Sequence, residues 1–144
     1  MTSSLRTFEG RCHCGALGFT FETALPVPRW SVRACGCGFC RAHGALTTSD
    51  PTGRLTFRVR ERRLLQRYRF GLRTADFLLC RDCGVYVGAQ IAAPEGAFGI
   101  LNVLALTPLP QELPAAAGAD YGAESTSQRI ARRSARWTPL EKLL

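Results

Sequence analysis

The sequence has almost no lysine and no long hydrophobic run. Lys142 is the single lysine against 18 arginines, so guanidinium groups carry nearly all of the positive charge. No apolar stretch reaches the roughly 18 residues of a membrane-spanning helix, so we expect no membrane partner. The first ten residues, MTSSLRTFEG, lack the basic-then-apolar pattern of a secretory signal. These absences predict a soluble, cytoplasmic protein.

The composition is that of one globular domain. The chain has 144 residues, of which 46% are hydrophobic and 21% are charged, and a chain of this length can bury one proper core. We expect a single domain over residues 1–144, with a core at about 9–106 and a tail at 107–144. The tail would either wrap the domain or reach a neighbouring chain, as in a homodimer. The net charge of +8 would attract anionic ligands or nucleic acid but identifies neither.

Short strands dominate the expected secondary structure. Residues 16–23 alternate aromatic side chains with small or polar ones, which is typical of a strand. Residues 107–128 are rich in Pro, Ala and Gly and predict a loop, and residues 127–136 predict a short helix capped by Ser125 or Ser127. The other expected strands are 29–35, 44–48, 54–60, 64–70, 76–80, 85–91 and 98–106. The predicted fold class is mainly β.

Seven cysteines form three clusters, in a compartment where disulfides are rare. The clusters are CHCG at 12–15, CGCGFC at 35–40 and CRDCG at 80–84. A Cys-x-x-Cys pair at a tight turn can place two thiolates on one tetrahedral ion, and the glycines after Cys14 and Cys83 suit such turns. Scattered core cysteines would not form three tight groups, and no βαβ pattern supports a thioredoxin-like redox pair. Soft thiolate clusters favour zinc over iron.

The seven sulfur atoms divide naturally into four and three. Four thiolates close a tetrahedral structural site, whereas three leave one vertex open for water or substrate, as in a catalytic zinc site. The spacing allows two partitions. The first is a zinc ribbon of Cys37, Cys40, Cys80 and Cys83. The second is a closed site of Cys12, Cys14, Cys80 and Cys83 with an open site of Cys35, Cys37 and Cys40.

The ordered triple motif resembles the glutathione-dependent formaldehyde-activating enzymes, whose wider family includes the centromere protein V domain. The segments GRCHCGAL, CGCGFCRAHGA and CRDCG match the family pattern G-x-C-x-C-G, C-x-C-x-x-C-R-x-x-x-G and C-x-x-C-G. The resemblance spans about residues 9–103. Arg132-Arg133 and Trp137-Thr138 also resemble a common tail of this family.

The resemblance implies an Mss4-like fold of folded-over β-sheets with zinc-binding turns and a short C-terminal helix. It favours the second partition, with a structural zinc on Cys12, Cys14, Cys80 and Cys83 and a labile catalytic zinc on Cys35, Cys37 and Cys40. It implies addition of glutathione, the co-substrate, to formaldehyde, a carbon–sulfur lyase reaction of the S-hydroxymethylglutathione synthase type. One position departs from the family, since Gly36 stands where relatives often have histidine.

Three further side chains are candidates beside the cysteines. Arg41 directly follows the open site and could hold a substrate carboxylate bidentately, although a surface arginine more often pairs with Asp or Glu. His43, three residues past Cys40, has the spacing of a fourth ligand. His13 could be a ligand or a proton shuttle, but at such a turn it more often faces solvent. The arginines at 58, 60 and 62 would share one face of a continuous strand, where they could bind an anion.

Two classes of function remain open. The first is a zinc-dependent carbon–sulfur lyase-like enzyme that acts on glutathione, or a similar small thiol, and on formaldehyde or a related carbonyl adduct. The second is a non-catalytic zinc-binding module for protein or nucleic acid. The three-sulfur cluster favours the enzyme, because an open vertex has no use in a purely structural site. We therefore expect a small thiol rather than nucleic acid as the partner.

Overall fold

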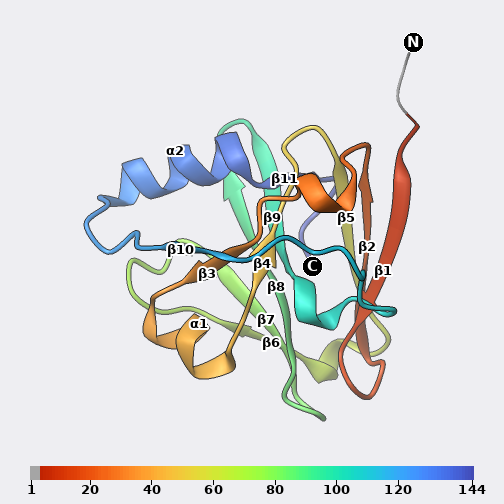
Figure 1. Cartoon of the computed structure of the whole chain (residues 1–144). Coiled ribbons are helices and arrows are strands. Elements are labelled where there is room, and N and C mark those ends of the chain that lie inside the picture. Colours follow the sequence, from red (N-terminus) through yellow and green to blue (C-terminus); the bar gives the residue numbers. More distant parts are fainter. Residues whose placement is uncertain (1–3) are drawn as a thin grey trace.

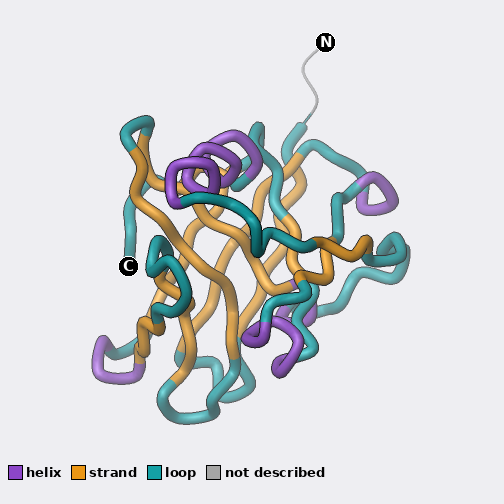
Figure 2. Tube along the Cα trace, turned by 90° about the vertical axis from the view of Figure 1, so that its left-hand side faces the viewer, coloured by secondary structure: helices purple, strands orange, loops and turns teal. Residues whose placement is uncertain are grey.

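The computed structural model describes residues 4–144 and is mainly β, as predicted (Figure 1). The strands are β1 (Arg6–Arg11), β2 (Leu17–Thr23), β3 (Arg33–Cys35), β4 (Thr47–Thr48), β5 (Arg54–Val59), β6 (Leu65–Tyr68), β7 (Asp76–Cys80), β8 (Tyr86–Ala93), β9 (Gly96–Asn102), β10 (Ala117–Ala119) and β11 (Thr138–Leu140). The helices are α1 (Gly38–His43) and α2 (Thr126–Arg136), with single 3-10 turns η1 (Val27–Arg29), η2 (Arg62–Leu64) and η3 (Val103–Ala105). Figure 2 shows the helices on the outside of the strands. Within residues 4–144, no helix is long and apolar enough to span a bilayer.

The strands form one sheet that branches at β9. Along one edge, β9 pairs antiparallel with β8, which continues to β7 and β6. Along the other edge, residues 97–99 of β9 pair with β11, and residues 101–102 pair with β4. From β11 the sheet continues through β5 and β2 to β1, and from β4 it continues through β3 to β10. The branch therefore brings β3 and α1 close to the strands of the first edge.

Two buried clusters fill the space that the sheet encloses. In β2 the alternate residues Leu17, Phe19 and Phe21 are buried, as the two-residue period of a strand predicts. They belong to the larger cluster, which also contains Leu55. The smaller cluster contains Phe77, Tyr86, Ile100, Trp137 and Cys40. The smaller cluster thus places one of the cysteines of residues 35–40 against packed aromatic side chains.

The predicted strands 29–35 and 44–48 are shorter than expected, and the helix between them was not predicted. Pro28 lies within η1, so the strand is confined to Arg33–Cys35. Residues 38–43 form α1, which is too short to display the 3.6-residue period that predicts a helix. Gly44 ends this helix in the left-handed conformation with φ 59°, so β4 begins only at Thr47. The expected strand 98–106 likewise ends at Asn102, whose side chain caps η3.

The tail contributes to the sheet. Ala117–Ala119 is a strand inside the segment expected to be a loop, and it pairs parallel with β3. Thr138–Leu140 inserts between β5 and β9. The predicted helix is confirmed and begins at Thr126, with Ser125 as its N-cap in a capping box with Gln128. The sheet therefore extends beyond the expected core at both ends, since β1 begins at Arg6.

Candidate metal centre and adjoining cavity

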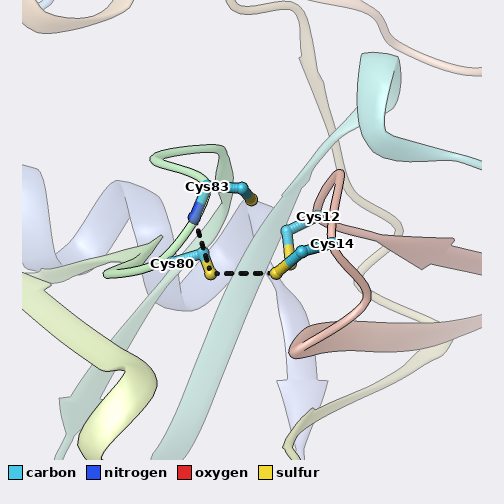
Figure 3. A group of neighbouring side chains, drawn as sticks. All are labelled: Cys12, Cys14, Cys80 and Cys83. Atoms are coloured by element: carbon cyan, nitrogen blue, oxygen red, sulfur yellow. Dashed lines mark hydrogen bonds between the residues drawn. The ribbon is translucent and has the colours of Figure 1, made fainter.

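Four cysteines meet where the β1–β2 turn faces the β7–β8 turn (Figure 3). The sulfur atoms of Cys12, Cys14, Cys80 and Cys83 all lie within 4.8 Å of one another. The Cys14 Sγ is 3.8 Å from the Cys12 Sγ and 3.5 Å from the Cys80 Sγ. Two segments more than 60 residues apart in the chain therefore present their thiols to a single point.

Backbone N–H groups surround these four sulfurs. The Leu17 N–H donates to the Cys12 Sγ at 3.2 Å, and the Cys83 N–H donates to the Cys80 Sγ at 3.4 Å. Burial raises the pKa of the Cys12 thiol. For Cys83 burial also opposes ionisation, but hydrogen bonds from the backbone at Cys14 and Val85 outweigh it and lower the pKa to about 6. The backbone contacts thus stabilise negative charge on the sulfur of Cys83, whereas the pKa of Cys14, like that of Cys12, is raised, in its case to about 12.

The other three cysteines form a separate group around the start of α1. The sulfurs of Cys35, Cys37 and Cys40 lie within 4.8 Å of one another. Cys35 ends β3, and Cys37 is the N-cap of α1, where its sulfur accepts the Cys40 N–H at 3.4 Å. The Gly36 N–H donates to the Ala119 carbonyl at 2.9 Å, so β10 holds the intervening turn in place. This short path explains how three thiols from six consecutive residues converge.

Ionisation is uneven within this second group. The Cys40 thiol donates a hydrogen bond toward Cys35, which lowers the pKa of Cys35 to about 5 against the opposing effect of burial. The same contact raises the pKa of Cys40, and burial raises it further. Within this group, negative charge is therefore favoured on Cys35 and disfavoured on Cys40.

The sulfur atoms are grouped as in the second partition, and the zinc-ribbon pairing of residues 37–40 with 80–83 does not form. Among the described residues, neither His13 nor His43 joins a group of metal-ligating side chains. The ring of His43 lies against Phe39, with the ring centroids 4.4 Å apart. Arg41 is exposed on α1 and is not among the described residues that line the cavity beside the three cysteines.

The arginines at 58, 60 and 62, which were expected to share one face of a continuous strand, do not form such a face. Arg58 pairs with Glu9 at 2.9 Å on the exposed face of the sheet. Arg62 begins η2, so it does not continue the strand that carries Arg58. Arg69 pairs with Asp76 at 2.6 Å. Because carboxylates neutralise some of these arginines and the strand ends before others, this stretch forms no single anion-binding face.

A cavity of about 170 Å³ opens beside the three-cysteine group. The three cysteines form part of its wall, and apolar side chains form another part, among them Phe70, Phe77 and Ile100. A further part of the wall is cationic and comes from β3 and α2. Its charged donors are Arg33, Arg129, Arg132 and Arg133. The expected cation beside the open site, Arg41, is thus replaced by Arg33, which precedes the cysteines on β3, and by three arginines from the distant helix α2.

Both cysteine groups have the donor chemistry of zinc sites. The first offers four soft sulfur donors, which is the ligand count of a closed structural zinc site. The second offers three and leaves one vertex of a tetrahedron open. Each group could therefore hold zinc, and the backbone N–H contacts at Cys12 and Cys80 are those expected around zinc-bound thiolates.

Comparison with known proteins agrees with this arrangement. The family model described as glutathione-dependent formaldehyde-activating enzyme matches residues 7–117. A Rhodobacter sphaeroides protein of known crystal structure is similar, with 32% sequence identity and a TM-score of 0.57. The match covers 77% of this chain and 99% of that one. No curated protein matches. Since the family match spans most of the chain and includes all three cysteine clusters, the chain belongs to the glutathione-dependent formaldehyde-activating enzyme family.

Proposed function

We propose that the protein is a zinc-dependent carbon–sulfur lyase-like enzyme. It would join glutathione, or a similar small thiol, to formaldehyde or a related carbonyl compound, or catalyse the reverse cleavage. The observation that carries the proposal is the three-cysteine group of Cys35, Cys37 and Cys40 in the wall of a cavity. An incomplete ligand set facing a cavity is the arrangement of a catalytic rather than a structural zinc site.

The two cysteine groups would have different roles. Cys12 and Cys80 are each 1% exposed, so the four-cysteine group is suited to a permanent structural zinc that stabilises the fold. Cys35, Cys37 and Cys40 would hold the second, more labile zinc with one fewer protein ligand. Zinc at this position would lower the pKa of a bound thiol and so supply the thiolate nucleophile.

The side chains around the cavity would assist the addition by excluding water and by orienting the substrate. Sulfur forms its bond to the carbonyl carbon as the C=O electron pair moves to oxygen, and that oxygen takes up the proton that the thiol lost. Phe70, Phe77 and Ile100 keep this wall apolar, which favours attack by a desolvated thiolate. Arg41, outside the cavity wall, would meet only a part of the substrate that extends beyond it.

Zinc content and thiol binding test the proposal together. The gently isolated protein should carry between one and two zinc ions per chain. In calorimetric titration, the zinc-loaded protein should bind glutathione more tightly than S-methylglutathione, which has no free thiol. Equal binding of the two, or of neither, would contradict the thiol–zinc contact and favour a non-catalytic zinc module. Absence of zinc with seven freely titratable thiols would contradict both readings.

A further inference from the structure

Three buried nitrogen atoms around the cavity have no hydrogen-bond partner. They are the Nε of Arg33, the Nε of Arg133 and the indole Nε1 of Trp137. Within residues 4–144, these are all the buried side-chain nitrogen or oxygen atoms that lack a partner, and all three residues line the same cavity. Buried donors without acceptors are costly and uncommon in folded proteins. Their concentration at one place indicates that something rich in acceptors belongs there.

The arginines of the cavity wall fall into two classes. Arg129 and Arg132 share one carboxylate, because Glu124 accepts from the Nε of each, at 3.2 Å and 2.7 Å, and so offsets one of their two charges. In contrast, no carboxylate of the described residues pairs with Arg33 or Arg133.

The two guanidinium groups without a paired carboxylate donate to hydroxyl groups, and that of Arg133 also lies over the Trp137 ring, 4.8 Å from its centroid. The Arg33 Nη2 donates to the Ser49 hydroxyl at 2.6 Å, and the Arg133 Nη1 donates to the Thr74 hydroxyl at 2.8 Å. Arg133 is 8% exposed, and burial, followed by the nearby charges of Arg132 and Arg129, lowers its pKa to about 10. A guanidinium has five N–H donors, so most donors on both residues remain available.

The nearby thiolates do not account for both charges. Three thiolates together with one Zn²⁺ carry a single negative charge, which offsets one of the two free guanidinium charges. Asp120 also lines the cavity, but its side chain is exposed and accepts the Gly122 N–H at 2.9 Å. Since burying an unpaired charge is strongly unfavourable, the cavity is complementary to a ligand that brings an anionic group of its own.

The positions of the groups fix where that anion lies relative to sulfur. Arg33 and Cys35 are separated by one residue on β3, so their side chains leave the same face of the strand, with Cα atoms about 7 Å apart. We propose that the cavity recognises a thiol bearing a carboxylate a few bonds from its sulfur, and that Arg33 and Arg133 hold that carboxylate, with the Trp137 indole N–H as a further donor. This inference rests on the proposed function, because the sulfur is assigned to the three-cysteine group.

The size of the cavity limits what can enter. Its volume of about 170 Å³ is smaller than the roughly 300–1,000 Å³ of pockets that enclose drug-sized ligands. The cavity therefore holds the thiol and one carboxylate, and the remainder of a larger thiol such as glutathione lies outside. A compact mercaptocarboxylate should then satisfy the cavity on its own.

Three probes separate the carboxylate contact from the thiol contact. In calorimetric titration of the zinc-loaded protein, 3-mercaptopropionate should bind at least about tenfold more tightly than 2-mercaptoethanol, which has a hydroxyl in place of the carboxylate. Propionate, which has no thiol, should bind weakly at the same place and compete with 3-mercaptopropionate. Equal affinity for the two thiols would overturn the carboxylate contact while leaving the proposed function intact.

Arginine variants assign the contact to residues. Arg33→Gln and Arg133→Gln should each remove the preference for 3-mercaptopropionate, whereas Arg41→Gln, on exposed α1, should keep it. Thermal denaturation and zinc content establish that each variant is folded. If the buried Arg133→Gln variant does not fold, the result for Arg33→Gln alone tests the assignment of the carboxylate contact. If neither thiol binds but propionate binds and Arg33→Gln abolishes this, the proposed function fails and the anion site stands. A preference that survives Arg33→Gln would overturn the assignment.

Discussion

Gly15 and Gly84 hold nearly the same backbone conformation, with φ values of 84° and 81°, on opposite sides of the four-cysteine group. Each glycine directly follows the second cysteine of its pair. A Cβ atom added at either position would meet nothing within 4 Å, so space does not require glycine there. The requirement is the positive φ itself, which lets each turn present its cysteines to the same point.

Replacing Gly84 should destabilise the protein through backbone strain alone. We expect Gly84→Ala to lower the free energy of unfolding by about 1–2 kcal/mol, because a left-handed conformation costs an ordinary residue roughly this amount. Thermal or denaturant unfolding of the zinc-loaded protein measures the change. Gly118→Ala is the matched control, since its Cβ also has open space and its φ is not positive. Equal losses in the two variants would show that positive φ is not the cause.

Cysteine variants should separate the two metal sites. Cys12→Ser and Cys80→Ser should prevent stable folding, because they remove a ligand from the buried group whose zinc contributes to folding free energy. Cys37→Ser should give a folded protein that retains one zinc ion and has no activity. Circular dichroism with zinc analysis measures both properties. The opposite pattern, in which Cys37→Ser unfolds and Cys80→Ser loses only a labile ion, would reverse the assignment of the sites.

Within the three-cysteine group, Cys35 should be the first thiol to be alkylated. When mild chelation removes only the labile zinc, alkylation of Cys35 by iodoacetamide should rise as pH increases through about 5, where its lowered pKa places the change from thiol to thiolate. Cys40, whose pKa is raised, should react last. Mass spectrometry of the peptides follows each site, and Cys35→Ser should lose the low-pH phase. Half-maximal modification of Cys35 near pH 9 would contradict this.

Glu124 should stabilise the protein in a pH-dependent way. Its hydrogen bonds with Arg132 and then Arg129 lower its pKa, so its contribution is complete above the pKa of the unfolded chain and is lost as pH falls through the folded value. At pH 7 we expect Glu124→Gln to cost about 1 kcal/mol, and the cost should vanish once both states are protonated. Glu112→Gln, at an exposed residue without an ion pair in the described part of the chain, should change little. A cost that is independent of pH would contradict the ionic origin.

The sequence predicted the cysteine groups far better than the cavity beside them. Cysteine clusters and the glycines after Cys14 and Cys83 are local patterns, so their chemistry could be anticipated without knowledge of the fold. Arg33 and Arg133 are a hundred positions apart, and only the sheet and α2 bring them to one wall. Arg41 lay close to the open site in sequence, but α1 carries it on an exposed surface.

The other differences between the predicted and the observed secondary structure lie in very short elements. The helix α2 was predictable, because Ser125 and Gln128 form a capping box that is visible as a local pattern. In contrast, β10 and β11 contain three residues each, too few to show an alternating pattern. Both strands form because a partner strand already offers unpaired backbone groups, a condition that depends on tertiary structure and not on the segment's own residues.

The place of β11 in the sheet sets an order of assembly during synthesis. Thr138–Leu140 pairs with β5 on one side and β9 on the other, although the ribosome makes these residues after both partners. A nascent chain that has completed β9 therefore still exposes unpaired edges on both strands, which are the groups that allow unwanted strand association. Trp137, the residue before β11, also lines the cavity. The same late step thus closes the sheet and completes the cavity wall, so we expect a chain released early to be prone to aggregation and to lack the complete cavity.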